Sequence, residues 1–273
     1  TRQATLFPYT TLFRSLIVKE CFGYEAERHS FLDGEICGIG SCLGQYTLHG
    51  SAMMRLQQRI NGIRKPHVYV WGTGFINYSD ADGKLFKRNM EFCAVRGELT
   101  RKNVERMTGK KMDIPMADAG ILASELLKER PEVCYDVGVV PHLCDLKDPA
   151  VKKLLASYDN AKFINVKDDP LQVVKEIAEC RYIISSSLHG LIVADSLGIP
   201  NMYLVFGDRL LGDGYKFEDY YSAYGVEAQP RDLRTEKAPE LTEIEEQYQI
   251  LPEMVEEKKH QMKATFPYPV KNR

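Results

Sequence analysis

The sequence lacks the features that mark membrane-spanning and nucleic-acid-binding proteins. No apolar run approaches the ~20 residues that a membrane-spanning helix needs, and we expect no signal peptide. A formal net charge of -2 over 273 residues gives no global attraction to nucleic acid or to a membrane surface, so any anion site must be local. We therefore expect a cytoplasmic protein without a nucleic-acid partner; a peripheral position at the inner membrane surface stays open.

The cysteines follow no pattern of disulfides or metal ligands. Seven of them are scattered along the chain without a CxxC pair, which predicts free thiols in a reducing compartment. No other group of residues has the spacing of a metal site, so we expect no metal. Several cysteines fall in apolar runs, where packing is their expected role.

Two glycine pairs follow apolar runs, but neither completes a dinucleotide-binding fingerprint. Gly38 and Gly40 form one GxG, and Gly72 and Gly74 form the other. The full GxGxxG pattern is absent, and no acidic residue stands where a ribose ligand would be. We interpret these glycines as the ends of strands.

What the sequence does contain is a regular alternation of strand and helix patterns. Strands are expected at residues 35–41, 68–75, 91–95, 133–140, 162–166, 182–184 and 201–206. Helices are expected at residues 51–60, 96–107, 121–127, 149–158, 170–180 and 188–198. The apolar members of the first helix are Met53, Met54, Leu56 and Ile60, and Asp118 is the expected N-cap near 121. This rhythm predicts an α/β fold with doubly wound parallel sheets.

The charged stretch KERP at residues 128–131 is the best boundary between two halves. It predicts an N-terminal domain over 16–130, a C-terminal domain over 131–235, and a helix and tail over 236–273. The last helix, at 241–262, is interrupted near Pro252 and is expected to brace the two domains. Residues 1–15 lack an initiator Met and resemble a translated sequencing adapter, so we expect a non-native leader and a first domain truncated at its N-terminus.

The stretch at residues 182–200 carries the strongest signal for chemistry. Apolar residues of strand length precede Ser185, Ser186 and Ser187, and a helical pattern then opens at Leu188 and His189. A helix N-terminus presents free N–H groups to an anion, and a histidine beside it can move protons near neutral pH.

Three further candidates follow the ends of strands or a glycine-rich loop. Arg96 ends the third strand and is either an anion clamp or a surface ion-pair partner. His142 follows the fourth strand and is either a cleft residue or a structural histidine. Lys216 follows the glycine-rich loop at 207–214 and is a candidate contact for phosphate or carboxylate.

Seven motifs, taken in order, resemble the polysaccharide pyruvyl transferase family. They are GIGSCLG (38–44), VWGTGF (70–75), AVRGELTRK (94–102), MADAGIL (116–122), GVVPHLCD (138–145), SSSLHGLIVADSLGIP (185–200) and GDGYKFEDYYSAYG (212–225). The resemblance implies transfer of the enolpyruvyl carbons of phosphoenolpyruvate onto two hydroxyls of a sugar, as a cyclic ketal in polysaccharide biosynthesis. It also implies two Rossmann-like domains facing a cleft, as in GT-B glycosyltransferases, with phosphoenolpyruvate as donor substrate and no cofactor. The acceptor is a saccharide, either free or linked to lipid or nucleotide.

Ketal formation assigns roles to the candidates. It needs a proton for the methylene carbon, removal of two hydroxyl protons and a clamp for the departing phosphate. His189 is the first choice for acid–base work, and its helix N-terminus should lower its pKa; a neutral donor and a structural role are the alternatives. Arg96 suits bidentate binding of phosphate or carboxylate. Ser185, Ser186, Ser187 and Leu188 would supply donors from the turn, unless the serines only cap and form it, and His142 and Lys216 would line the cleft.

Two departures separate this chain from many family members. Ser187 stands where an arginine often precedes Leu-His-Gly, and an Asn-Phe-Gly-Asp-like first loop is absent. The rival readings are a GT-B glycosyltransferase or sugar-nucleotide epimerase, and a non-catalytic relic that binds glycan or nucleotide. The rival enzymes need a carboxylate near a ribose; Asp195 is the candidate, although it is equally placed to be an exposed helical residue.

Overall fold

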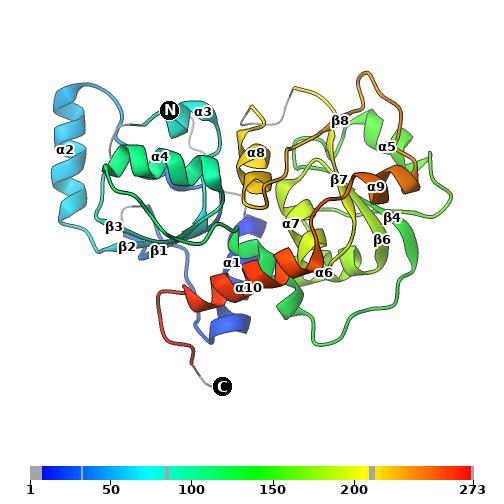
Figure 1. The fold of residues 1–273 in the computed structure, drawn as a ribbon, viewed down its shortest axis with the longest axis horizontal. Helices are drawn as coiled ribbons and strands as arrows, with labels where there is room; N and C mark the ends of the chain where they lie inside the picture. Colours follow the sequence, from blue (N-terminus) through cyan, green and yellow to red (C-terminus); the bar gives the residue numbers. More distant parts are fainter. Residues whose placement is uncertain (1–7, 32, 84–85, 209–212, 272–273) are drawn as a thin grey trace.

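The computed structural model describes residues 8–31, 33–83, 86–208 and 213–271. Two parallel sheets form two lobes, with helix α8 between them and helix α10 crossing below both (Figure 1). The chain is therefore a mixed α/β protein with parallel sheets, consistent with Rossmann-like folds. No helix in the described part of the chain is long and apolar enough to span a membrane.

The first lobe holds a three-stranded sheet in the order β1-β2-β3. Its strands are β1 (Ile36–Gly40), β2 (Val68–Thr73) and β3 (Met90–Val95). Its helices are η1 (Leu43–Tyr46), α2 (Ala52–Ile63), α3 (Tyr78–Ala81) and α4 (Glu98–Thr108). Val68, Val70 and Val104 are among the residues of its own core, which lies between the sheet and α4.

The second lobe holds a five-stranded sheet in the order β5-β4-β6-β7-β8, with every neighbouring pair parallel. Its strands are β4 (Tyr135–Val140), β5 (Ala161–Phe163), β6 (Cys180–Ser185), β7 (Asn201–Val205) and β8 (Arg231–Asp232). Its helices are α5 (Pro149–Leu155), α6 (Pro170–Ala178), α7 (Leu188–Ser196) and α9 (Leu241–Gln247). Val139 and Val140 lie in different core clusters because successive side chains of a strand point to opposite faces, so both faces are covered.

Four further helical segments bind the lobes together. They are α1 (Pro8–Phe22), the 3-10 helix η2 (Ala119–Leu126), α8 (Tyr215–Ser222) and α10 (Pro252–Ala264). Trp71 of β2 donates its indole N–H to the carbonyl of Met262 in α10 at 3.0 Å, and its ring packs edge-on against Phe266. One hydrophobic cluster runs through Trp71, Leu191 and Met262, so the expected bracing role of the C-terminal helix is confirmed.

The order of strands and helices agrees with the sequence-based prediction, and the bounds of the elements need comment at three places. The helix expected at 121–127 is a 3-10 helix that begins at Ala119. The helix expected at 241–262 is divided into α9 and α10, which meet near Pro252 as the sequence indicated. Helix α1 begins at Pro8 and so crosses the expected leader boundary at residue 15; residues 1–7 lie outside the described residues.

Helix α2 departs most from expectation. Its apolar members Met53, Met54, Leu56 and Ile60 are all exposed. The helix contacts the lobe through Gly62 instead, where an added Cβ would lie 1.9 Å from the carbonyl oxygen of Lys87. Arg59 holds the same edge by donating to the carbonyls of Phe86 and Arg88. The apolar stripe of this helix is thus turned away from the core.

Candidate functional site

The candidate residues of the second lobe gather at the carboxyl edge of its sheet. His142 follows β4, which ends at Val140, and His189 lies in the first turn of α7, directly after β6. Strands β4 and β6 are parallel neighbours, with Val140 paired to Ser185, so their carboxyl ends meet. Lys216, in the first turn of α8, approaches closely enough for its charge to act on both histidines.

The serines between β6 and α7 build the turn. The Ser185 hydroxyl donates to the carbonyl of Val140 at 2.7 Å and accepts from the backbone N–H of Ser187 at 2.9 Å. The Ser186 hydroxyl donates to Asp145 Oδ2 at 2.7 Å and accepts from the backbone N–H of His142 at 2.8 Å. Both hydroxyls are therefore used within the fold, in agreement with the turn-forming alternative, and Ser186 ties the two strand ends together.

The next two residues open helix α7. Ser187 holds its N-cap position without a capping hydrogen bond from its side chain. The Leu188 side chain is buried in the hydrophobic cluster that joins the lobes, so only its backbone is suited to substrate contact. The groups of this turn that could still donate hydrogen bonds to a substrate are its backbone N–H groups and the Ser187 hydroxyl.

His189 lies at the junction of the lobes. A Cβ added at Gly40, the end of β1, would lie 3.3 Å from Cε1 of His189, so the imidazole packs against the first lobe. Its Nε2 is buried and has no hydrogen-bond partner among the described residues. Burial lowers its pKa to about 4, with smaller contributions from Arg14, Lys216 and Arg96. The pKa of His189 is thus lowered, as predicted, but the main cause is burial and not the helix N-terminus.

His142 is also neutral at physiological pH. Its Nδ1 lies 3.0 Å from the Cys144 sulfur. Burial lowers its pKa to about 3, and the charges of Lys216 and His189 lower it further. A neutral imidazole can accept a proton on one nitrogen and donate from the other.

Lys216 supplies the positive charge of the site. Lys216 is only 8% exposed, and its Nζ lies 5.2 Å from the centre of the Phe217 ring. Among the described residues it makes no hydrogen bond and no ion pair. Burial lowers its pKa to about 8, followed by the charge of Arg96. A buried ammonium without a protein partner favours an anionic ligand, which would repay its desolvation. Residues 209–212 of the preceding glycine-rich loop lie outside the described residues.

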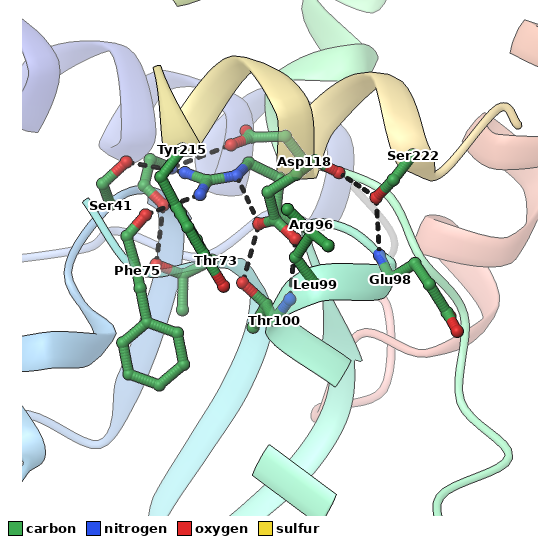
Figure 2. A network of polar contacts seen from close by, with 12 residues as sticks. Ser41, Thr73, Phe75, Arg96, Glu98, Leu99, Thr100, Asp118, Tyr215 and Ser222 are labelled. Atoms are coloured by element: carbon green, nitrogen blue, oxygen red, sulfur yellow. Dashed lines mark hydrogen bonds and ion pairs between the residues drawn. The ribbon is translucent and has the colours of Figure 1, made fainter. Parts of the chain in front are cut away.

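Arg96 is part of a buried polar network. It is fully buried, so it is not a surface ion-pair partner. Its Nε donates to Asp219 Oδ2 at 2.8 Å, while Nη1 and Nη2 donate to the Ser41 hydroxyl and the Phe75 carbonyl, each at 2.6 Å (Figure 2). The guanidinium therefore joins β3 to α8 and to the loops after β1 and β2. It contributes a fixed positive charge to the neighbourhood of Lys216 and His189.

Sequence reasoning missed Asp219, which completes this network. Its Oδ1 accepts from the backbone N–H of Thr100, and its Oδ2 accepts from the Thr100 hydroxyl, both at 2.7 Å (Figure 2). It lies three residues after Lys216 in the KFEDYY segment, so one helix carries both the unpaired lysine and the anchor for Arg96. The sequence of this helix, YKFEDYYS, has two adjacent carboxylates among its aromatic residues, and nothing local distinguishes the buried Asp219 from Glu218.

Asp118 links the same region to the first sheet. Its Oδ1 accepts from the backbone N–H of Gly120, which confirms the predicted N-cap. Its Oδ2 accepts from the backbone N–H of Gly40 at 3.0 Å. The cap therefore also fixes the end of β1, against which His189 packs.

Asp195 is neither exposed nor available to a ribose. It is fully buried and accepts hydrogen bonds from Tyr220 at 2.6 Å, from Asn201 at 2.6 Å and from Tyr248 at 2.9 Å. Burial raises its pKa to about 6. This carboxylate joins α7 to α8 and to the linker between α9 and α10. Asp195 is therefore not the ribose ligand that a glycosyltransferase or sugar-nucleotide epimerase would need.

Comparison with known proteins places the chain in a family. A family model described as polysaccharide pyruvyl transferase matches residues 46–206, which is more than half of the chain. An uncharacterized protein of Acanthamoeba polyphaga mimivirus is 34% identical over 164 residues, covering 58% of this chain and 55% of the viral protein. The succinoglycan biosynthesis protein ExoV of Rhizobium meliloti is 23% identical over 169 residues, covering 60% of this chain and 50% of ExoV.

The chain spans about half the length of these relatives. The matched family region contains Arg96, His142 and His189, and ends before Lys216. Transferase chemistry in polysaccharide pyruvylation is the activity of the family as its description states it. The chain belongs to the polysaccharide pyruvyl transferase family.

Proposed function

We propose that this protein transfers pyruvate from phosphoenolpyruvate onto two hydroxyls of a saccharide, forming a cyclic ketal. The observation that carries the proposal is the buried Lys216, which makes no hydrogen bond or ion pair within the described residues, beside two neutral histidines at the edge of the second sheet. Phosphoenolpyruvate carries a phosphate and a carboxylate, so it offers negative charge to the Lys216 ammonium. Lys216 is the group that we assign to this anion.

In the proposed reaction, the donor gains one proton and loses phosphate. A proton added to the methylene carbon leaves a cationic carbon, which one sugar hydroxyl attacks. Loss of phosphate regenerates the cation, and the second hydroxyl closes the ring. The two hydroxyls release two protons; one balances the proton taken up by carbon, and the other leaves on phosphate. The reaction therefore consumes no external acid or oxidant.

His189 and His142 are the groups that we assign to these proton transfers. Both are neutral when the site is empty, so each can accept a hydroxyl proton. A bound trianionic donor would raise the pKa of both, because an opposite charge favours the imidazolium form. Donor binding would thereby supply the acid needed at the methylene carbon. Arg96 acts in this scheme as a positioning residue for α8 and as a fixed charge.

The arrangement of the lobes fits a donor and an acceptor that meet between them. We propose that the two lobes are Rossmann-like domains that face a cleft in the GT-B manner, with the donor held by the second lobe. His189 packs against the end of β1, which would place acid–base chemistry at the junction. The name of ExoV supports a polysaccharide precursor as acceptor, and the acceptor is either free or linked to lipid or nucleotide.

Isotope labelling tests the proposed proton transfer. The protein is incubated with phosphoenolpyruvate and glycans with suitably placed hydroxyl pairs in deuterated water, and the ketal methyl group is examined by NMR. The proposal predicts a singly deuterated methyl in the ketal and a loss of product in the Lys216→Met variant. Lys102→Met, which alters an exposed lysine of α4, is the matched control and should keep full activity. Activity with UDP-sugars but not with phosphoenolpyruvate would favour the rival glycosyltransferase.

A further inference from the structure

Helix α2 presents an apolar stripe to solvent. Met53, Leu56, Ile60 and Ile63 follow one another at alternating steps of three and four residues, which places them on one side of a helix. Their exposed fractions range from 43% to 82%. A contiguous exposed apolar surface of this kind marks an interaction site in soluble proteins.

The protein fixes the outward orientation of this stripe. Arg59 Nη1 donates to the carbonyls of Phe86 and Arg88 at 2.9 and 3.0 Å, and Gly62 lies against the carbonyl of Lys87. These contacts hold one side of the helix to the lobe and leave the other side free. Figure 1 shows α2 at the outer end of the first lobe, away from the second lobe.

The charges around the stripe are of one sign. Residues 51–66 contain Arg55, Arg59, Arg64 and Lys65 and no carboxylate. Lys65 pairs with Asp33, Arg59 donates to carbonyls on the side held to the lobe, and Arg64 is exposed at the end of the helix. Two copies of this face would bring like charges together, so self-association is opposed, whereas an anionic surface would be attracted.

We propose that α2 docks the protein on an anionic lipid surface. The apolar stripe would enter the boundary between headgroups and acyl chains, and Arg64 and Lys65, just past the last turn of α2, would meet the lipid phosphates. This inference is independent of the proposed reaction. It depends on a local basic face, since the formal net charge of the whole chain is -2.

Vesicle sedimentation tests the inference with the full chain. Vesicles of phosphatidylcholine alone are compared with vesicles that also contain phosphatidylglycerol, at low and high salt. The protein should bind the anionic vesicles at least about tenfold more strongly, and added salt should weaken that binding. The Met53→Gln, Leu56→Gln and Ile60→Gln triple variant should lose most of the binding, and Arg64→Gln with Lys65→Gln should lose the preference for phosphatidylglycerol.

The controls separate docking from misfolding and from dimer formation. Val133→Gln changes an apolar residue that is 53% exposed in the other lobe, and it should bind like the parent. The variants should keep the parent melting temperature, because the substituted side chains and the ion pair between Lys65 and Asp33 are exposed. Absence of binding to both vesicles would overturn the inference, as would equal binding of the triple variant. Light scattering that shows a dimer split by the triple variant, without vesicle binding, would assign the face to a second copy and also overturn it.

Discussion

Arg96 and Asp219 form a fully buried ion pair, with Nε and Oδ2 2.8 Å apart, that fastens helix α8 to the end of strand β3. Because α8 also carries Lys216, the pair sets where the positive charge of the candidate site lies. On its other side, α8 is fastened to α7 through Tyr220 and Asp195. The helix is thus held by polar contacts to both lobes, and the geometry of the site depends on those contacts.

Removing one partner of this pair should be costly. Asp219→Ala leaves a buried guanidinium unpaired, so the free energy of unfolding should fall by about 3–5 kcal/mol in urea denaturation. Asp33→Ala removes the exposed partner of Lys65 and should leave the free energy of unfolding nearly unchanged, because solvent screens an exposed ion pair. Equal, small losses for both variants would show that the buried pair is not needed to hold α8.

Gly97 should tolerate no side chain. An added Cβ would lie 1.6 Å from the backbone carbonyl oxygen of Asp219, so Gly97→Ala must push α4 and α8 apart. We expect a loss of about 3 kcal/mol or more in the free energy of unfolding. Gly207→Ala is the control, because no atom of the described residues lies within 4 Å of its added Cβ, and it should change stability by less than about 0.5 kcal/mol. A stable Gly97→Ala protein would contradict this packing.

The buried histidines should make stability fall as the solution becomes acidic. The unfolded pKa of histidine is 6.5, whereas that of folded His189 is about 4, so below pH 6.5 the unfolded state binds protons that the folded state does not. This loss continues down to about pH 4. Asp195, with a folded pKa raised to about 6, acts in the opposite direction between about pH 6 and 3.8 and offsets part of it.

His189→Asn should therefore reduce the acid dependence of stability. Denaturation midpoints at several pH values between 7 and 4 would be compared for the parent, this variant and His29→Asn, which alters an exposed histidine. The parent and His29→Asn should lose stability in parallel, and His189→Asn should lose less. Parallel curves for all three proteins would mean that His189 is not held in the neutral form by the fold.

Lys216 should impose an alkaline limit on donor binding. With a pKa of about 8 in the empty site, the ammonium loses its proton as the pH rises through that value, so the affinity for phosphoenolpyruvate should fall above about pH 8. Lys216→Arg keeps a cation at higher pH and should move the decline upward. Calorimetric titration between pH 7 and 9.5 measures this, and an unchanged affinity across the range would exclude Lys216 as the donor contact.

Sequence reasoning succeeded where local pattern and sheet geometry decide the outcome. Parallel strands end at one edge, so residues directly after β4 and β6 could be expected near one another, and His142 and His189 both lie at that edge. The N-cap role of Asp118 followed from its place before a helical pattern, and the hydrogen bond to Gly120 confirms it.

Contacts between distant segments could not be read from the sequence. Arg96 and Asp219 are 123 positions apart, and nothing local indicates that they pair. Asp195 looked like an exposed or ligand-binding residue because its partners Tyr220 and Tyr248 come from later helices. The outward stripe of α2 was hidden for the same reason, since the face a helix buries depends on its neighbours and not only on its own periodicity.

The most direct test of the central claim is acceptor-dependent release of phosphate from phosphoenolpyruvate, measured together with formation of the glycan ketal by mass spectrometry. The parent protein should release one phosphate for each ketal formed, and His189→Asn and Lys216→Met should abolish both while Lys102→Met retains them. Phosphate release without ketal, or ketal formation that persists in both site variants, would contradict the assignment of this site to pyruvyl transfer.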